Sequence, residues 1–284
     1  MRATSVGLTL LVGVGLSPYG AWAGPPPGDD LPTSELKDHH RHHQHGGIPH
    51  FVEMGLDTLG EAEAETPQVE KLEDELHACM EPVEDNEKAV LLMIADGVAA
   101  GAVDAAKVEA GVAKLKVSAG LIHDCVAGPL NQLHSTLSPV ERAELGDKVQ
   151  AHWEVWRHVN HDAEAGGREP GSRLADLARE LSLTGAQVEK LSPALRTALA
   201  GQGAKLDAER IKGLVQKFAT DFAGDAFDAR TVKTNTTADL TAHGTMRMAL
   251  FYETVAPLLT PAQRTTLAGH LREHASHHAE VPAP

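Results

Sequence analysis

The sequence predicts an all-α protein. Aromatic residues make up only 4% of the chain, while alanine, leucine and charged residues are common. This composition favours helices packed through small and aliphatic side chains over a β-sandwich. Apolar residues also recur at helical spacing, as in Leu72, Leu76, Cys79, Met80 and Val83, which share one face at 3.6 residues per turn. A recurrent helix-start pattern, described below, is the third observation.

The N-terminus has the features of a secretory signal peptide. Arg2 precedes an uncharged apolar run over residues 6–16, and Ala21-Trp22-Ala23 has the small-x-small pattern of a cleavage site. This run is too short to cross a hydrocarbon core about 30 Å thick, and no later stretch is long and apolar enough. We therefore expect a signal peptide over residues 1–23 and a periplasmic or secreted mature chain without a membrane span.

The remaining chain divides into four segments by composition. Residues 24–58 are rich in Pro, Gly and His, which predicts a disordered leader. Helical patterns occupy residues 59–165 and 172–284. The Gly- and Pro-containing segment 166–171 between them predicts a linker. We expect two helical repeats joined by this linker.

The two helical regions are copies of one another. Three segments of the first region recur in the second, in the same order and at offsets between 119 and 124 residues. The matched segments are 68–72 with 187–191, 94–108 with 218–232, and 137–145 with 259–267. Matches in a fixed order at nearly constant offset indicate an internal duplication.

Each copy predicts four helices. In the first copy we expect them at residues 67–81, 84–100, 104–134 and 139–161. In the second copy we expect them at residues 185–199, 207–224, 228–255 and 261–278. The third helix of each copy is the longest, about 45 Å at 1.5 Å per residue.

Three helix starts carry a capping box, in which a Ser or Thr caps the helix and a Glu or Gln three residues later bonds back to the cap. The pairs are Ser138 with Glu141, Thr184 with Gln187, and Thr260 with Gln263. Proline at the first helical position strengthens two of the three. Each cap is expected to contribute about 1 kcal/mol to its helix. On physical grounds alone, these pairs predict helix starts and no further role.

The second-copy boxes both read Leu-Thr-x-x-Gln, and in this the chain resembles the Spy/CpxP family of periplasmic proteins. Members carry two such motifs per subunit in a small all-α fold, and subunits pair as a curved homodimer that holds unfolded clients without ATP. The resemblance implies two tandem Spy/CpxP-like units. These would form a pseudo-dimer within one chain or a homodimer between chains, and both alternatives stay open.

The resemblance implies an ATP-independent chaperone for unfolded or misfolded envelope proteins, with a sensor receptor as a further partner. The first copy departs from the family pattern, because it keeps only the Ser138/Glu141 variant and a degenerate Glu65-Thr66-Pro67-Gln68. It also departs in charge. The best-known chaperone-type members have a basic cradle, whereas this copy is acidic.

The formal charge of −15 is concentrated in the first copy. Residues 59–165 contain eight Lys and Arg against 21 Asp and Glu, a net charge of −13, whereas residues 168–284 are close to neutral. Such a chain offers no basic surface for a phosphate backbone, which argues against nucleic-acid binding. The acidic half is expected to be a solvated surface, with attraction for cations or basic partners as the alternative.

Two groups of histidines suggest a metal-binding alternative. They are His39, His40, His42, His43, His45 and His50 in the leader, and His270, His274, His277 and His278 in the last predicted helix. Imidazoles one helical turn apart can bind Zn²⁺, Cu²⁺ or Ni²⁺, so metal buffering or sensing is the second functional hypothesis. We expect no required cofactor, with zinc or another divalent transition metal as the alternative. His152, His158 and His161 are expected on a helix surface.

The chain has two cysteines, Cys79 and Cys125, both in the first copy. In an oxidising compartment an even pair favours a disulfide. Two buried thiols, or a soft-metal site with His77 and His123, are the alternatives.

No sequence motif indicates catalysis. The chain lacks a Gly-x-Ser-x-Gly elbow, a His-Glu-x-x-His pair, a phosphate-binding glycine loop and a Cys-x-x-Cys pair, so we do not expect an enzyme. Trp153 and Trp156 lie at helical spacing with Val149 and Val159. Core packing is their expected role, and exposure as a client-binding platform is the alternative.

Overall fold

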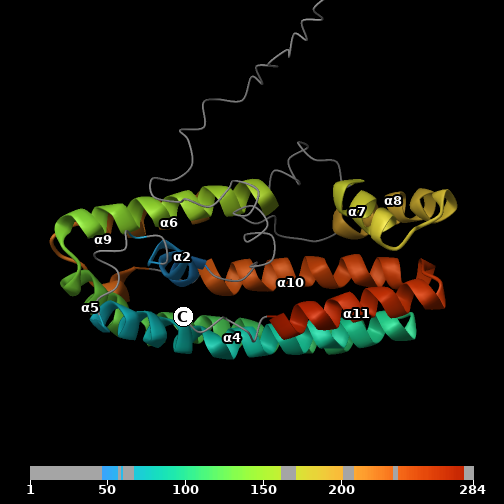
Figure 1. Ribbon diagram of the computed structural model, residues 1–284, viewed down its shortest axis with the longest axis horizontal. Helices are drawn as coiled ribbons and strands as arrows, with labels where there is room; N and C mark the ends of the chain where they lie inside the picture. Colours follow the sequence, from blue (N-terminus) through green and yellow to red (C-terminus); the bar gives the residue numbers. More distant parts are fainter. Residues whose placement is uncertain are drawn as a thin grey trace, which may run out of the picture.

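The computed structural model describes residues 47–56, 59, 67–160, 171–200, 208–232 and 236–277. Within these residues every regular element is a helix and no strand occurs, which confirms the all-α prediction. The helices run mostly along the length of an elongated bundle (Figure 1). Across the same residues, no helix combines the length and the hydropathy needed to cross a membrane.

The first part of the chain forms α2 (Gly47–Leu56), α4 (Pro67–Ala100), α5 (Ala105–Thr136) and α6 (Pro139–Asn160). The second part forms α7 (Gly171–Glu180), α8 (Gly185–Ala200), α9 (Ala208–Ala223), η1 (Ala229–Thr231), α10 (Thr236–Val255), η2 (Ala256–Leu258) and α11 (Pro261–His277). The predicted signal peptide, most of the leader, residues 161–165 of the first predicted repeat and residues 166–170 of the predicted linker lie outside the described residues.

Helix α2 departs from the predicted disordered leader. Its side chains Ile48, Phe51, Val52 and Leu56 are almost completely buried, and the helix packs on α6 and α10. Their spacings of three, one and four residues are those of one helical face. Average composition over residues 24–58 hides this ten-residue segment among Pro, Gly and His.

Helix α4 is continuous where we predicted two helices with a break near residue 82. Pro82 lies inside it, and the Asn86 side-chain amide donates to the Pro82 carbonyl at 2.6 Å. Met80 and Val83 on either side are buried, so the apolar face runs through the proline. Burial of this face offsets the local cost of about 3 kcal/mol for an interior proline. The matching part of the second copy is divided between α8 and α9.

Helix α7 also differs from the prediction. It begins at Gly171, the last residue of the predicted linker, and precedes the four helices expected in the second copy. Leu174, Leu177 and Leu181, on α7 and just after it, are buried. Gly171–Glu180 is therefore a packed element, and not a passive connection.

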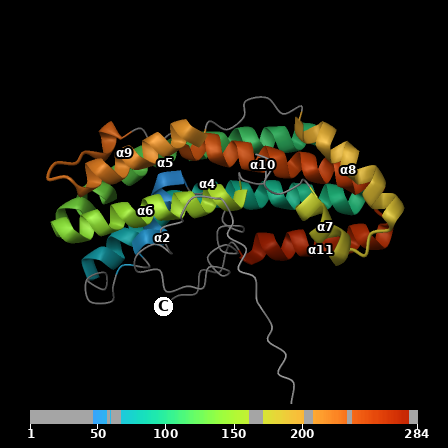
Figure 2. The same ribbon diagram turned by 90° about the horizontal axis from the view of Figure 1, so that it is seen from above.

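The two copies pack reciprocally through their helices. The last helix of the first copy, α6, packs along α9, and the last helix of the second copy, α11, packs along α4. The middle helices α5 and α10 pack on each other. Figures 1 and 2 show α11 beside α4 at one end of the bundle and α6 beside α9 at the other. Each copy therefore covers a face of the other.

Two hydrophobic cores result, and each draws residues from both copies. The first core joins α2, the start of α4, the end of α5 and α6 to α9 and Leu240 of α10. It contains Trp153 and Trp156, which are 1% and 7% exposed and thus have the expected packing role. The second core joins the end of α4 and the start of α5 to α7, α8, α10 and α11. Neither core can be completed by one copy.

Candidate functional site

All three predicted capping boxes have their two bonds. At Thr260 the backbone N–H donates to Gln263 Oε1 at 2.9 Å, and the Gln263 N–H donates to Thr260 Oγ1 at 3.3 Å. Thr184 and Gln187 repeat the same two bonds at 2.9 and 3.3 Å. Ser138 and Glu141 bond in the same way, with a short contact from the Ser138 N–H to the Glu141 carboxylate. Each pair satisfies two N–H groups that a helix start leaves without partners.

The two Leu-Thr-x-x-Gln motifs meet in one corner, which the sequence reasoning did not predict. The Gln187 side-chain amide donates to Gln263 Oε1 at 2.8 Å and to the Leu258 carbonyl at 3.0 Å. The Gln263 amide donates to the Leu181 carbonyl at 3.2 Å. Each glutamine therefore caps its own helix with its oxygen and crosses to another element with its NH₂ group. This glutamine corner joins α8, α11, η2 and the end of α7.

The first copy has a simpler version of this corner. The Gln68 side-chain amide donates to Thr136 Oγ1 at 3.1 Å, near the end of α5. Glu141 occupies the position of Gln263, and an ionised carboxylate has no N–H to donate across the corner. Its oxygens can close the box at Ser138 but cannot reproduce the amide pairing of the second copy.

An arginine follows each of the two equivalent boxes and reaches into the opposite copy. Arg142 of α6 is 9% exposed and lies 3.6 Å from the Asp225 carboxylate, just after α9. Arg264 of α11 donates to the Ala100 carbonyl at the end of α4, at 3.5 Å. A cation is favourable beside the terminal carbonyls of a helix. Arg142 and Arg264 are aligned by the duplication, which could have identified them from sequence.

Arg264 lies against a glycine that the turn after α4 requires. Gly101 has φ +87°, a conformation that disfavours other residues. A Cβ at Gly101 would stand 1.6 Å from Nη1 of Arg264. Both the backbone conformation and the close approach of the arginine therefore select glycine at this position.

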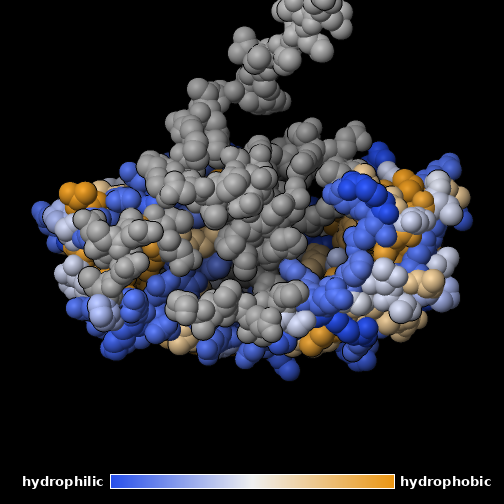
Figure 3. All heavy atoms as spheres, in the orientation of Figure 1, coloured by the Kyte–Doolittle hydropathy of each residue, from blue (hydrophilic) through white to orange (hydrophobic). Residues whose placement is uncertain are grey.

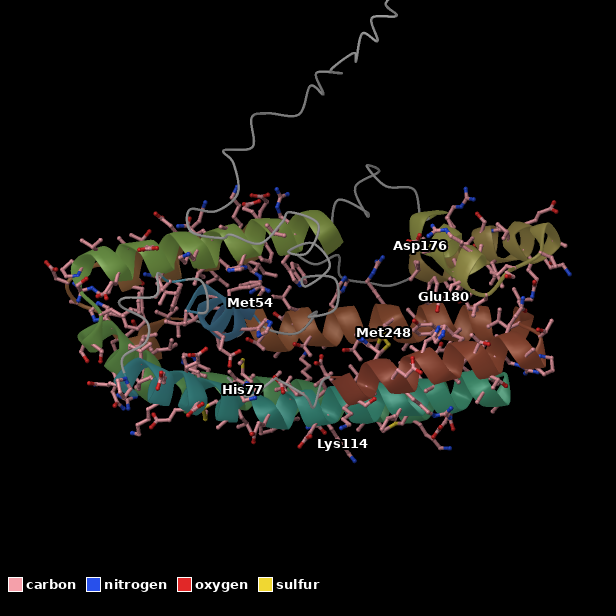
Figure 4. All side chains as sticks on the ribbon, in the orientation of Figure 1. Met54, His77, Lys114, Asp176, Glu180 and Met248 are labelled. Atoms are coloured by element: carbon pink, nitrogen blue, oxygen red, sulfur yellow. A yellow bond between two sulfur atoms is a disulfide. The ribbon has the colours of Figure 1, made fainter. Side chains whose placement is uncertain are left out.

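The second half of α10 carries apolar side chains that are only partly buried. Met248, Phe251 and Tyr252 fall within about 100° of the helix circumference and pack at the edge of the second core. The Phe251 and Tyr252 rings meet edge-on at 5.2 Å. Figure 4 labels Met248 on α10. We call these three side chains the α10 face.

Figure 3 shows apolar residues at the surface of the end of the bundle where α7, α8 and α10 lie, interspersed with hydrophilic ones. Glu253 lies next to the α10 face in sequence. Partial burial, together with the nearby Glu109 carboxylate of α5, raises the pKa of Glu253. A carboxyl group with a raised pKa carries less charge beside the apolar side chains as the pH falls.

Cys79 and Cys125 form a disulfide between α4 and α5, with 5.7 Å between their Cα atoms. It closes a segment of 46 residues within the first copy. The aligned positions in the second copy are Ala198 and Arg247, so that copy has no equivalent link. The bond staples the α4–α5 hairpin on one side of the molecule only.

The histidines divide into those the structure describes and those it does not. His39, His40, His42, His43, His45 and His278 lie outside the described residues, as does the side chain of His277. Of the others, His270 of α11 contacts the carboxylate of Glu180 of α7, and Glu180 is labelled in Figure 4. Among described residues, no group of three or more His, Cys, Asp or Glu side chains is arranged to hold a metal ion.

His50 is part of α2, and its Nδ1 lies 3.3 Å from the Glu53 carboxylate. Nδ1 of His77 lies at the same distance from the other Glu53 oxygen, which ties α4 to α2. The prediction that His152 lies on a helix surface is wrong, because it is only 2% exposed. It lies beside Trp153 in the sequence, on the buried side of α6 against α2 and α9.

One carboxyl group is buried in the first half of the molecule. Glu87 of α4 is 6% exposed. Burial, reinforced by the neighbouring Glu84 carboxylate, raises the pKa of Glu87 well above its ordinary value, while His50 opposes the shift. Sequence gave no signal for this residue, since many exposed glutamates surround it in the chain.

No protein-family model, curated protein or solved structure matches this chain. The fold class therefore rests on the structure, and the likeness to Spy/CpxP proteins rests on the capping motifs and their recurrence in the two copies.

Proposed function

We propose that this protein is an ATP-independent chaperone of the cell envelope that binds apolar segments of misfolded clients on the α10 face. The observation that carries the proposal is the set of partly exposed Met248, Phe251 and Tyr252 in the copy that holds both Leu-Thr-x-x-Gln motifs. The predicted signal peptide supports the location, and the motifs support the likeness to Spy/CpxP chaperones.

The chemistry of the α10 face suits variable clients. Methionine is flexible and polarisable, so it adapts to differently shaped apolar partners. Tyrosine and phenylalanine add large contact areas, and tyrosine keeps a polar group at the edge. Burial of client apolar surface contributes about 25 cal/mol per Å² before the entropic costs of binding. Binding of this kind needs neither a deep pocket nor a nucleotide.

The glutamine corner would hold this face in place. Gln187 bonds the Leu258 carbonyl of η2, which directly follows α10. The motif would then act through position, by fixing the end of the client-binding helix against α8 and α11. This role explains why two helix caps recur together in one binding protein.

The reciprocal packing of the copies supports an intramolecular pseudo-dimer. Helix α6 of the first copy packs on α9 of the second, and α11 of the second copy packs on α4 of the first. Helices α5 and α10 pack on each other, as expected for two subunits related by a two-fold axis. Joining the subunits in one chain replaces a concentration-dependent association by an intramolecular one. The cradle would then persist at dilutions that separate two chains.

The test is light scattering of an aggregating model client with the mature protein, without ATP and in metal-free buffer. We expect suppression near a one-to-one ratio, lost in M248N/F251N and kept in M248L/F251L, which preserves the apolar surface. V140N is the matched control, because Val140 is an exposed apolar residue of α6 far along the chain from α10. Circular dichroism must show all variants folded. Absence of suppression by the wild-type protein would refute the proposal.

Metal buffering is the second candidate, favoured by His270 and His274 one turn apart on α11 and by the leader histidines. Titration with Zn²⁺ of the wild-type chain and of a chain lacking residues 39–45 tests it. The deletion stops before His50, because that residue belongs to the packed helix α2. Tight zinc binding that the deletion abolishes, without client protection in any condition, would favour this candidate over the chaperone.

A further inference from the structure

Helix α5 carries an exposed apolar patch on the side away from both cores. Val117 and Leu121, one turn apart, are 67% and 63% exposed. In the described part of the chain two other large apolar side chains are exposed, Leu92 at 36% and Val140 at 74%. Adjacent exposed valine and leucine on one helical face indicate a contact surface.

A charged residue of each sign stands at either end of this patch. Lys114 precedes it and Asp124 follows it, both on the same side of α5 by helical periodicity. Both side chains are exposed, and neither forms an ion pair with another described residue. Figure 4 shows the Lys114 side chain pointing outward from the bundle.

The patch is complementary to itself. The four residues are arranged symmetrically in sequence about Ala119, with Val117 and Leu121 inside and Lys114 and Asp124 outside. If the α5 helix of a second chain lies antiparallel against the first, Val117 of one chain lies opposite Leu121 of the other chain. Lys114 then lies opposite Asp124. A two-fold axis at the height of Ala119, whose own side chain is buried in the first core, thus brings together two apolar pairs and two opposite-charge pairs.

The backbone of α5 allows a close approach on this side. Added Cβ atoms at Gly120 and Gly128 would have no neighbour within 4 Å. In the antiparallel arrangement Gly128 of one chain stands at the level of Ala110 of the other, so small residues face small residues. Helices approach most closely where small residues line the contact.

We propose that two chains form a homodimer by packing the outward faces of their α5 helices antiparallel. Val117 and Leu121 lie at the centre of the interface, and Lys114 of each chain pairs with Asp124 of the other chain. The interface is isologous and closed. In the second repeat, Asp239 and His243 stand at the positions aligned with Val117 and Leu121, and Asp239 already forms an ion pair with Arg210 at 2.9 Å. Among the described residues the second repeat therefore does not repeat this patch, and pairing through the single α5 patch gives a dimer and not a filament.

The expected dimer is concentration-dependent. A single helix pair buries less than the roughly 1,200–2,000 Å² typical of stable interfaces. It is separate from the packing of the two repeats, which lies within one chain, and it does not involve the α10 face.

Sedimentation velocity of the mature protein over a range of concentrations provides the test. We expect a monomer–dimer equilibrium whose dissociation constant rises about tenfold or more in L121E, because the apolar centre is lost. V140E makes the same change at an apolar residue that is more exposed than Leu121, and it should leave the equilibrium unchanged. A monomer at all concentrations, or an equal effect of V140E, would overturn the proposal.

Charge exchange tests the antiparallel arrangement. K114D alone and D124K alone should each weaken the dimer about threefold to tenfold, since each places like charges opposite one another. K114D/D124K restores both pairs with reversed polarity and should recover most of the wild-type affinity. Additive weakening in the double variant contradicts the proposed register. Loss of client protection in L121E without any dimer in the wild type assigns the patch to clients and refutes the homodimer.

Discussion

The two repeats differ in the bonds that link their first helix to their long middle helix. In the first, the Cys79–Cys125 disulfide links α4 to α5, while the helix-start corner has one side-chain bond from Gln68 to Thr136. In the second, no cysteine is present, and Gln187 and Gln263 pair across the corner. One repeat is fixed covalently, and the other is fixed by hydrogen bonds that can open. The comparison shows that the region held by hydrogen bonds is also the one that carries the α10 face.

Removal of the disulfide should have the largest effect. C79S/C125S relaxes a loop of 46 residues, for which chain entropy predicts a loss of about 4 kcal/mol in the free energy of unfolding. Urea unfolding of the variant, and of the wild type with and without reductant, measures it. If reductant leaves the wild-type midpoint unchanged, the covalent link does not stabilise the first repeat and the contrast between repeats fails.

The next largest effect should be the difference in stability between alanine substitutions of Gly101, which follows α4, and Gly224, which follows α9. G101A should cost about 2 kcal/mol or more, because alanine is strained at φ +87° and its Cβ meets Arg264. G224A, after α9, should cost less, since Gly224 has no positive φ. Thermal melts of both variants provide the comparison. Equal losses would show that the arginine contact does not distinguish the two turns.

The glutamine corner should show coupling that the first repeat lacks. Q187A and Q263A should each lose about 1–2 kcal/mol of stability, and the double variant should lose clearly less than their sum because they share bonds. Q68A and E141A should be additive, since no described bond joins them. Denaturant unfolding of the two double-mutant cycles measures this, and additivity in both would remove the special role of the amide pair.

Replacement of the two glutamates with raised pKa, Glu87 and Glu253, should have the smallest effect on stability, and this effect should depend on pH. The raised pKa of Glu87 means that its contribution to stability is fully present below about pH 4.5 and is lost as the pH rises through the folded-state pKa. E87Q should therefore stabilise the protein at pH 7 by about 1 kcal/mol, with little change at pH 4. E253Q should act in the same direction but less, since Glu253 is less buried than Glu87. Unfolding at both pH values decides, and a gain confined to pH 4 would reverse the assigned sign.

The sequence predicted helix starts well where a capping box marks them, but the long helix predicted over residues 228–255 begins only at Thr236, after the short turn η1. The starts at Pro139, Gly185 and Pro261 agree with the structure, since the capping boxes that define them are local in the chain. The internal duplication stays a prediction from the sequence. Local signals of this kind carry most of the secondary structure of a helical protein.

Long-range features were not predictable in the same way. The exchange of α6 and α11 between the repeats depends on which apolar face meets which, and periodicity marks a face without naming its partner. The pairing of Gln187 with Gln263 was not predictable either, because in the sequence each glutamine already completes the capping box of its own helix. Helix α2 was missed for a different reason, since its short apolar face lies within a segment of opposite average composition.

The interleaved cores also set an order of events during synthesis. The first core includes Leu240, so Trp153 and the side chains around it cannot reach their final packing until most of the second repeat has emerged. At about 5–20 residues per second, that interval lasts several seconds. Contacts between residues so far apart in the chain also slow folding. Over this interval the apolar side chains of the first repeat that pack against α9 and Leu240 stay exposed to solvent.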